Sequence, residues 1–482
     1  MSLLWTTDAL IAAMNGRPVG EMPEGVSGIT IDSRNVSKGD AFFAIKGDKF
    51  DGHDFASGAI AAGAALIVVS EAKLPALGRL TVPMIVVPDV LKALEMLGIA
   101  SRARSKAQII AVTGSAGKTT TKEALRHVLS ACGKVHASAA SFNNHWGVPL
   151  TLAKMAEDTD YGVFEIGMNH AGEIRPLVKM VQPHVAIITI IAAAHLGHFK
   201  NLDEIAVAKA EIFEGLVEDG YAVINRDDTR FRKLDLLAKD AGVKHIYGFG
   251  EHRLSKFKLI KYKAMADCSV ITARINGIDI AAKIGAPGRH IVQNVLAVLG
   301  ACWLAGADLA KVSMALATLD AEKGRGRRHR LKVNGGAFTL IDESYNANPA
   351  SMAAALDLAA SIPTEGRGRH IAVLGDMLEL GKHSKKLHAE LAQPIKAARI
   401  NRVLMAGAEM QALDDALVPK GRVARAGKTK VKKVGVMGAS LELGDEPARR
   451  ALPANPDLRL DALVQRLRQA AGKPVLLMVD EV

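Results

Sequence analysis

The sequence predicts an α/β protein of three domains, with a central domain built on a doubly wound, mostly parallel sheet. Three observations support this fold class. The chain of 482 residues is long enough for about three domains. Apolar stretches typical of buried strands alternate with stretches of helical spacing, which favours a parallel sheet. One strand–helix pair is joined by a glycine-rich turn at residues 113–118, a type of turn that binds phosphate groups in such sheets.

Residues 1–104 are expected to form a small N-terminal α/β domain. Short extended pieces and turns come first, at residues 28–34 and 39–47. An alanine-rich helix and an apolar strand at residues 66–69 follow. These short pieces and turns differ from the regular alternation of strands and helices that begins after residue 105, so we place a domain boundary there.

Residues 105–320 are expected to form the central domain, and residues 321–482 a C-terminal Rossmann-like domain. The clearest strands of the two domains are expected at residues 109–112, 161–166, 185–191 and 221–224, and at residues 338–341, 371–374 and 403–405. Residues 420–456 are rich in basic and small residues and allow no clear prediction.

The formal net charge of +12 raises the question of nucleic-acid binding. Much of the excess lies in two basic runs, residues 323–330 and 422–433, and neither contains Phe, Trp or Tyr. Aromatic residues make up only 4% of the chain, so few side chains are available to stack on bases. We therefore expect no nucleic-acid partner, and we attribute the first run to a polyanionic small substrate and the second to solvated surface.

The sequence also bears on the compartment of the protein. No apolar run approaches the roughly 18 residues of a membrane-spanning helix, and the start of the chain lacks the basic and apolar regions of a secretion signal. The three cysteines, Cys132, Cys268 and Cys302, are scattered and form neither a disulfide framework nor a zinc motif. We expect a cytoplasmic protein without a membrane span.

The glycine-rich turn is typical of a phosphate-binding loop. Gly114 and Gly117 permit a tight turn between a buried strand and the helix expected at residues 118–131. Backbone N–H groups then converge on an anion at the helix N-terminus, Lys118 reaches the β- and γ-phosphates, and the hydroxyl of Thr119 is placed to bind Mg²⁺. The residues expected to contact nucleotide here are Gly114, Ser115, Ala116, Gly117, Lys118, Thr119 and Thr120.

The loop is a variant of the general pattern, because Val112 stands where that pattern has its first glycine. A Gly-Lys-Thr turn can also simply connect a strand to a helix without binding a ligand. The presence of strand, turn and helix together favours nucleotide binding.

Glu165 and His195 follow two further strands of the central domain. The carboxyl ends of parallel strands share one edge of a sheet, which is where open α/β sheets bind ligands. Mg²⁺ needs few hard protein ligands, since it keeps several waters and takes other oxygens from phosphates. Glu165 and Thr119 fit that role. Glu165 or His195 alone is more often a satisfied polar side chain, but the two together on successive strand ends of one sheet favour a functional site.

The chain resembles the Mur ligases, ATP-dependent enzymes that form amide bonds in peptidoglycan precursors. The resemblance covers residues 25–410 and includes the phosphate loop at 112–120 and the segment at 143–150 that faces the UDP-sugar and the metal. It implies that Glu165 and His195 bind magnesium, and that Lys209 is the carbamylated lysine that helps to hold a second Mg²⁺. It also implies that Asn294 contacts the adenine base.

Other segments point to a particular reaction within the family. Residues 342–352 and 374–381 resemble the member that adds D-alanyl-D-alanine to UDP-N-acetylmuramoyl-tripeptide, whereas the signature of the diamino-acid-adding member is not found. The resemblance implies that an arginine of residues 325–330, taken here as Arg327, and the acidic pair Asp342 and Glu343 close over ATP from the C-terminal domain. Because two domains then contact the nucleotide, we expect a closing movement about residues 319–324 that join them. The residues implied in substrate binding are Ser33, Arg34, Lys46, Asn143, Asn144, Tyr345, Asn346 and Asn348.

The implied reaction makes an acyl phosphate from the tripeptide carboxylate and ATP, and the amine of D-alanyl-D-alanine then displaces phosphate. Lys118, the loop amides and two Mg²⁺ ions would stabilise the charge on the transferring group. We expect a monomer.

Two alternatives stay open, another Mur ligase that adds the diamino acid and a ligase-like protein without turnover. Residues 475–482 resemble a strand that the family follows with a Lys-Gly-Ser turn, and the sequence stops where that turn would begin. A ligase-like protein that binds nucleotide without turnover is therefore a second hypothesis. A GTPase or motor would need an Asn-Lys-x-Asp motif, which is not found.

Overall fold

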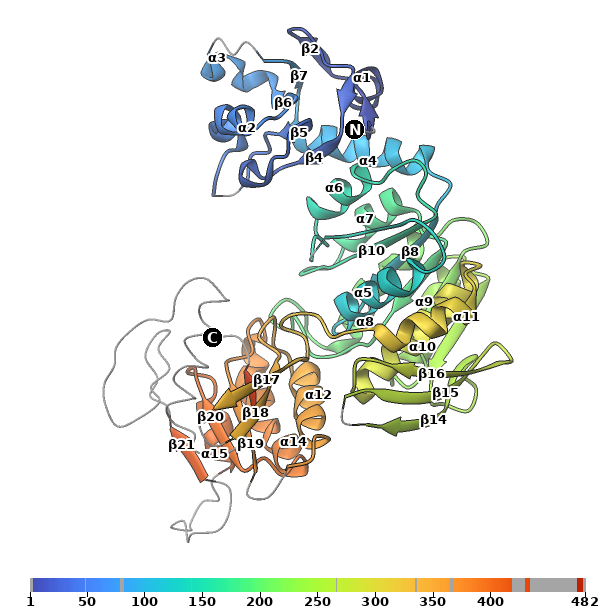
Figure 1. Cartoon of the computed structure of the whole chain (residues 1–482), viewed down its shortest axis with the longest axis vertical. Helices are drawn as coiled ribbons and strands as arrows, with labels where there is room; N and C mark the ends of the chain where they lie inside the picture. The colour runs from blue at the N-terminus through green and yellow to red at the C-terminus, as the bar shows by residue number, and fades with distance from the viewer. Residues whose placement is uncertain are drawn as a thin grey trace.

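The computed structural model describes residues 3–417 except 48, 79–81, 140, 266, 334–335 and 365–367, together with residues 430–433 and 475–479. In this part of the chain, three regions follow one another along an elongated molecule, each built around its own sheet (Figure 1). The second basic run and the segment at 420–456 lie almost entirely outside the described residues.

The N-terminal region contains a five-stranded sheet of order β2-β7-β6-β5-β4, in which all neighbours except β2 and β7 are parallel. The short strands β1 and β3 form a separate antiparallel pair. The elements of this region are β1 (Trp5–Thr6), α1 (Thr7–Met14), β2 (Arg17–Val19), β3 (Gly25–Val26), β4 (Gly28–Thr30), β5 (Asp40–Phe43), α2 (Ala56–Ala61), β6 (Leu66–Ser70), α3 (Leu74–Leu77), β7 (Met84–Val87) and α4 (Val90–Arg104).

The central region contains a nine-stranded sheet of order β16-β15-β14-β13-β12-β11-β8-β10-β9. Its elements are β8 (Gln108–Thr113), α5 (Lys118–Leu129), β9 (Val135–Ala137), α6 (Gly147–Ala153), β10 (Tyr161–Glu165), α7 (Ile174–Val181), β11 (Val185–Ile188), α8 (Leu202–Ala210), β12 (Tyr221–Asn225), α9 (Phe231–Asp240), β13 (His245–Gly250), β14 (Phe257–Ala264), β15 (Ser269–Ile275), β16 (Ile278–Ile284), α10 (Arg289–Leu304) and α11 (Leu309–Ala315).

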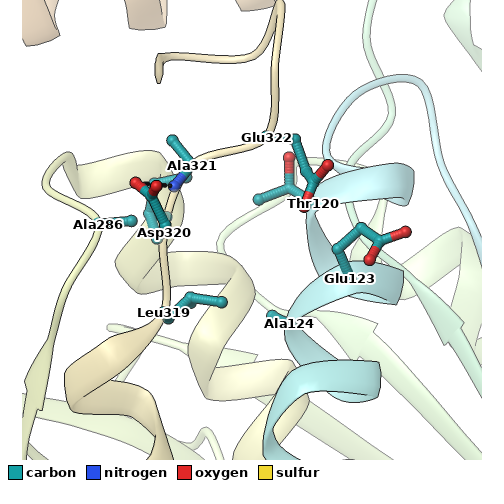
Figure 2. Close-up of a pocket in the computed structure, with 9 residues that line it drawn as sticks. Thr120, Glu123, Ala124, Ala286, Leu319, Asp320, Ala321 and Glu322 are labelled. Carbon is teal, nitrogen blue, oxygen red and sulfur yellow. Dashed lines mark hydrogen bonds between the residues drawn. The ribbon is translucent and has the colours of Figure 1, made fainter. Parts of the chain in front are cut away.

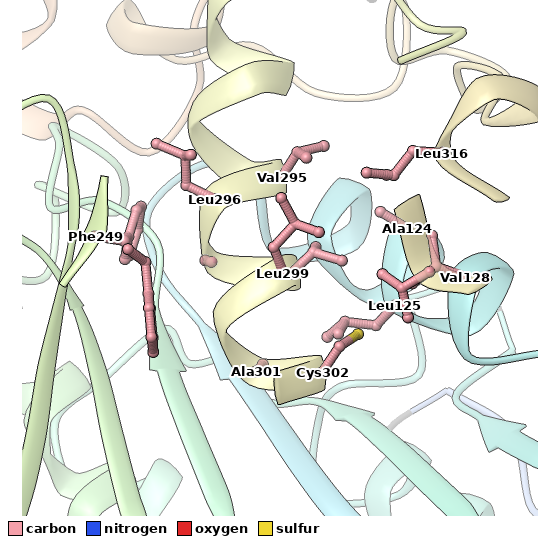
Figure 3. Close-up of a cluster of buried hydrophobic side chains, with 14 of the residues drawn as sticks. Ala124, Leu125, Val128, Phe249, Val295, Leu296, Leu299, Ala301, Cys302 and Leu316 are labelled. Carbon is pink, nitrogen blue, oxygen red and sulfur yellow. The ribbon is translucent and has the colours of Figure 1, made fainter. Parts of the chain in front are cut away.

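Helices cover both faces of this sheet, as the doubly wound prediction requires. Helices α5, α10 and α11 contribute to the hydrophobic core on one face, and α7, α8 and α9 to the core on the other. Figure 3 shows Leu299 and Cys302 of α10 directed toward Leu125 and Val128 of α5, with Phe249 on the other side of α10. Because these side chains are fully buried, α10 fixes the helix that carries the phosphate loop.

The C-terminal region contains a six-stranded sheet of order β17-β18-β22-β19-β20-β21, parallel except for the β17–β18 hairpin. Strand β22 lies between β18 and β19, so the last described strand of the chain is internal to this sheet. The elements are β17 (Arg327–Val333), β18 (Gly336–Asp342), α12 (Pro349–Ala360), β19 (Arg369–Leu374), α13 (Ser384–Glu390), α14 (Ala392–Ala397), β20 (Arg402–Met405), α15 (Gln411–Leu417), β21 (Lys430–Lys433) and β22 (Val475–Val479).

The strands predicted from the sequence are confirmed, with shifts of a few residues at their ends. The antiparallel strands β14, β15 and β16 were not predicted, although the turn between the last two carries a strong hairpin signal. Asn276 and Gly277 both have positive φ (46° and 94°), as a two-residue Asn-Gly turn requires. No helix in the described part of the chain is both long and apolar enough to cross a membrane.

Candidate active site

The candidate site lies where three neighbouring strands end. Strand β8 pairs with β10 on one side and with β11 on the other, all in parallel. In this register Glu165 at the end of β10 lies opposite Val112, and Ile188 at the end of β11 lies opposite Thr113. The chain crosses from one side of β8 to the other between β10 and β11, and such a switch point opens a crevice for ligands. The phosphate loop, Glu165 and His195 all follow these three strand ends.

The loop between β8 and α5 is held by its neighbours in an open turn. Gly114 and Gly117 have φ values of 152° and 82°, and Gly117 begins α5 in the left-handed region. The backbone N–H of Ser115 donates to the carbonyl oxygen of Ile190 at 2.8 Å. The hydroxyl of Thr189 donates to the carbonyl oxygen of Ala116 at 2.5 Å. Anchored in this way, the loop amides and the N-terminus of α5 form a pre-organised site for an anion.

Lys118 folds back onto this loop, since its Nζ donates to the carbonyl oxygen of Gly114 at 2.9 Å. Desolvation by the surrounding protein lowers the pKa of Lys118, and the Glu165 carboxylate opposes this shift. Thr119 and Ser115 are buried, and the Ser115 hydroxyl has no hydrogen-bond partner among the described residues. The loop therefore offers a cation and a free hydroxyl to a phosphate group.

Glu165 is the buried carboxylate of the site, with 1% of its surface exposed. Its Oε1 accepts a hydrogen bond from Asn143 Nδ2 at 2.7 Å, while its buried Oε2 has no partner among the described residues. A buried carboxylate oxygen without a partner is costly unless a cation or a donor binds it. Glu165 thus fits the role of a magnesium ligand. No cluster of three or more His, Cys, Asp or Glu side chains fit to hold a metal occurs in the described chain.

Lys209 lies on α8 and is buried, with 1% of its surface exposed. No hydrogen bond or ion pair joins its ammonium group to any other described residue. Burial holds the pKa of Lys209 well below its usual range, and the positive charge of Lys118 lowers it further. A buried ammonium beside a second cation favours either a neutral or a chemically modified lysine, or an anion bound nearby.

His195 follows β11 in a left-handed conformation, with φ 58°. Burial lowers the pKa of this imidazole, hydrogen bonding to the Glu379 carboxylate opposes the shift, and the charges of Lys209 and Lys118 lower it further. These mutual effects place His195, Lys209, Lys118 and Glu165 in one neighbourhood. The structure therefore brings together the four residues predicted to be catalytic.

The C-terminal region contacts this neighbourhood through Arg325 and Tyr345. The Arg325 guanidinium lies 4.0 Å from the ring centroid of Tyr345, and its charge lowers the pKa of Lys118. The Tyr345 hydroxyl donates to Ser141 Oγ at 2.6 Å, across the two regions. Arg327 is exposed on β17 and pairs with Asp342 in the strand ladder. Of these two arginines, Arg325 is thus the one whose charge acts on Lys118.

Asp342 and Asn348 have clear structural tasks in the same region. Asp342 is buried and accepts hydrogen bonds from the N–H of Gly324 and from the N–H and hydroxyl of Ser344. Asn348 caps α12 by accepting from the N–H groups of Ala350 and Ser351. Glu343 is partly exposed and Asn346 is exposed beside them.

The residues predicted to bind the UDP part of the substrate lie on turns of the N-terminal region and on the segment before α6. Ser33 and the exposed Arg34 belong to a single 3₁₀ turn, which Asp32 caps. Lys46 is exposed, and its backbone forms an isolated antiparallel β-bridge with Asp51. Asn144 is exposed, and its Oδ1 accepts from the N–H of Gly147 at the start of α6.

A small hollow of about 10 Å³, room for about one water molecule, lies behind the phosphate loop. Figure 2 shows Thr120 and Glu123 of α5 facing residues 319–322 of the segment that leads into the C-terminal region. Ala286 and Ile291 close the hollow from the side of α10. Nearby, the Asn294 carboxamide packs so tightly on the loop that a methyl group at Gly117 would come within 2.8 Å of it.

Three contributors to the site were missed in the sequence. Thr189 supports the phosphate loop, Arg325 acts on Lys118, and Glu379 hydrogen-bonds to His195. Arg325 lies within the basic run at 323–330, which the sequence had already associated with a polyanionic substrate. Thr189 carries no local signal, because its partners Thr113 and Ala116 lie 76 and 73 residues away. Glu379 lies in the segment 374–381, which was singled out from the sequence without a role for this residue.

Comparison with known proteins agrees with this geometry. The Mur ligase middle domain matches residues 112–302, the catalytic domain of the Mur ligase family residues 25–102, and the glutamate ligase domain of Mur ligases residues 326–448. The chain belongs to the Mur ligase family, whose members are ATP-dependent enzymes that form amide bonds.

Its relatives include UDP-N-acetylmuramoyl-tripeptide–D-alanyl-D-alanine ligases. The enzyme of Rickettsia prowazekii is 37% identical over 393 residues, which cover 81% of this chain and 85% of the relative. The enzyme of Escherichia coli is 34% identical over 417 residues, which cover 86% and 88%. A crystal structure of MurF from Acinetobacter baumannii matches with a TM-score of 0.79 and 27% identity, over 99% of this chain and 95% of that one.

Proposed function

We propose that this protein joins D-alanyl-D-alanine to UDP-N-acetylmuramoyl-tripeptide, with conversion of ATP to ADP and phosphate. The observation that carries the proposal is the position of Lys209, a buried cation without a partner among the described residues, beside Lys118 and the phosphate loop. Such an excess of buried positive charge suits a site that receives a triphosphate and a carboxylate. The named relatives act on these two substrates.

ATP is proposed to lie with its phosphates on the loop from Gly114 to Thr120. Its adenosine part is proposed to extend past Thr120 toward Ala286 and Ile291, whose apolar side chains suit contact with a base. Asn294 packs on Gly117 at the same end of the loop, which supports its assignment as a contact of the base. Arg327 and Glu343 are proposed to complete the nucleotide site when the C-terminal domain closes, with Asp342 holding the loops at 324 and 344.

Two Mg²⁺ ions are proposed to bind beside the phosphates. The donor set fits them, because Glu165 has a buried oxygen without a partner among the described residues and Thr119 lies in the first turn of the helix at the phosphate site. Carbamylated Lys209 would replace a buried ammonium with an anionic oxygen ligand, and His195 is the remaining protein ligand. When bound, the metal neutralises charge that develops on the transferring phosphoryl group.

The residues of the chain then have distinct tasks. Lys118 and the loop amides hold the γ-phosphate while the tripeptide carboxylate attacks it, so that an acyl phosphate and ADP form. The amine of D-alanyl-D-alanine attacks the acyl carbon, and phosphate leaves. Ser33, Arg34 and Lys46 are proposed to bind the UDP part, and Asn143 and Asn144 the sugar side. Tyr345, Asn346 and Asn348 are proposed to position D-alanyl-D-alanine.

We also propose the domain boundaries 1–104, 105–320 and 321–482, which agree with the division of the sheets. A monomer in the cytoplasm suits the reaction, because each domain contributes to a single site and both nucleotide substrates occur there.

The proposal is tested by measuring phosphate release from Mg-ATP while one of the two other substrates is left out in turn. We expect release only when both are present, with the pentapeptide product detected by mass. ATP binding without release would support the alternative of a ligase-like protein that does not turn over. The Lys209→Ala variant serves as a control for contaminating ATPases, because any release that survives it comes from elsewhere.

A further inference from the structure

We propose that Glu379, on the C-terminal domain, is a positioning residue that fixes His195 of the central domain only when the two domains are together. This inference rests on the proposed function. Glu379 belongs to the segment 374–381, which the reaction described above leaves without a task. Its carboxylate accepts a hydrogen bond from Nδ1 of His195 over a sequence separation of 184 residues.

A second hydrogen bond joins the same two segments. The backbone N–H of Gly197 donates to the carbonyl oxygen of Glu379 at 2.7 Å. The backbones also meet closely, since a methyl group placed on Gly381 would lie 2.8 Å from the Cα of Gly197. Both ends of the side-chain contact have left-handed backbones, with φ 58° at His195 and 60° at Glu379. Side chain and backbone therefore fix the contact together, which a chance surface ion pair does not do.

The segment that carries Glu379 is rigidly attached to the C-terminal domain. The N–H of Met377 donates to Nε2 of the fully buried His388 at 2.9 Å. Asp376 accepts from the N–H of Met410 at 3.0 Å, and Leu380 is 1% exposed. Because the segment is anchored on both sides of Glu379, its carboxylate moves with the domain as a whole.

The chemical consequence concerns the two nitrogens of the imidazole. When Nδ1 donates its proton to a carboxylate, the lone pair of Nε2 is left free and the ring orientation is fixed. Here the carboxylate comes from a different domain than the imidazole. A ligand that needs Nε2 therefore binds better when the domains are together, and by linkage it favours that arrangement in return.

The experiment measures equilibrium binding of a non-hydrolysable ATP analogue, with Mg²⁺ and with EDTA, by calorimetry, together with small-angle scattering of the same samples. Glu379→Ala removes the carboxylate, and Glu379→Gln keeps an acceptor for Nδ1. Glu390→Gln is the matched control, because Glu390 is exposed on the same domain and, among the described residues, forms its ion pair with Lys386 one turn away. Equal thermal midpoints establish that the variants are folded.

In EDTA, we expect Glu379→Ala to bind the analogue with the affinity of the wild type. With Mg²⁺, its affinity should be about tenfold lower than that of the wild type, and scattering should show less compaction on binding. Glu379→Gln should lose only two- to threefold, and Glu390→Gln nothing. Wild-type-like affinity and compaction in Glu379→Ala would overturn the inference while leaving the proposed function intact. A wild-type chain that fails to bind the analogue would overturn the proposed function, and this inference with it.

Discussion

Replacing Lys209 with methionine should abolish turnover and yet stabilise the protein near neutral pH. Methionine has nearly the length of lysine, so the buried space on α8 stays filled and no cavity opens. The substitution removes an ammonium group that is 1% exposed and is repelled by Lys118. Removal of poorly compensated buried charge typically stabilises by about 1–4 kcal/mol. For a domain of this size, each kcal/mol raises the thermal midpoint by about 2–4 °C.

The pH dependence has a definite sign. The pKa of Lys209 is lower in the folded than in the unfolded chain, so between these two values the unfolded chain binds more protons. The stability contributed by this group therefore rises with pH across that window, and is smallest below the folded pKa. The Lys209→Met variant lacks this rise. Its advantage over the wild type should be greatest near neutral pH and shrink as the pH approaches the ordinary lysine value of about 10.4.

The assay is thermal unfolding of both proteins in bicarbonate-free buffer at pH 7 and pH 9. Lys200→Met is the matched control, because the Lys200 side chain is 86% exposed in the segment before α8 and should change the midpoint little. Added bicarbonate should raise the midpoint of the wild type only, since carbamylation replaces the ammonium of Lys209 with an anion that Lys118 attracts instead of repels. A Lys209→Met protein that melts below the wild type at pH 7 would refute the reasoning, because it would show that the ammonium is well compensated.

Three further outcomes are expected. Lys118→Ala should lower the rate of phosphate release by about 10³-fold or more, because the contact with phosphate is strongest in the transition state; a smaller loss would remove Lys118 from that role. Ser33→Ala should raise the KM for the UDP substrate with little change in kcat, and equal losses in kcat from both variants would contradict this division. Leu299→Ala should lower the free energy of unfolding by about 2–5 kcal/mol in thermal or urea unfolding, since Leu299 is fully buried on α10.

The fold was largely predictable because its main signals are local. The phosphate loop, the strand before it and the helix after it all appear in one stretch of about twenty residues, and the structure has them as β8 and α5. Alternating strands and helices also fix the parallel pairing, and with it the edge at which Glu165 and His195 meet. The strands β14 to β16 were missed although Asn276 and Gly277 mark the hairpin between the last two. The expected alternation of strands and helices was continued through this segment, whereas buried and exposed residues alternate there with the period of two that is typical of strands.

The role of individual polar residues was less predictable, since one motif can serve both structure and chemistry. Asn348 was singled out as a substrate contact, and its side chain caps α12. Asp342 was assigned to ATP, and its carboxylate holds the turns at Gly324 and Ser344. A short helix cap and a ligand contact use the same residue types, so spacing alone cannot separate them. Measured losses in stability and in KM for the same variant can separate them.

Contacts between domains are beyond the reach of local patterns for a different reason. Tyr345 meets Ser141 across 204 residues, and Glu379 meets His195 across 184. Tyr345 and His195 were each singled out from the sequence, but their partners were not, because the packing of two domains brings these pairs together rather than the path of the chain. Under the proposed closure of the C-terminal domain, these contacts form and break together and so couple the sites. The pairings that sequence patterns miss in this protein are thus those through which closure of the C-terminal domain can act on the phosphate site.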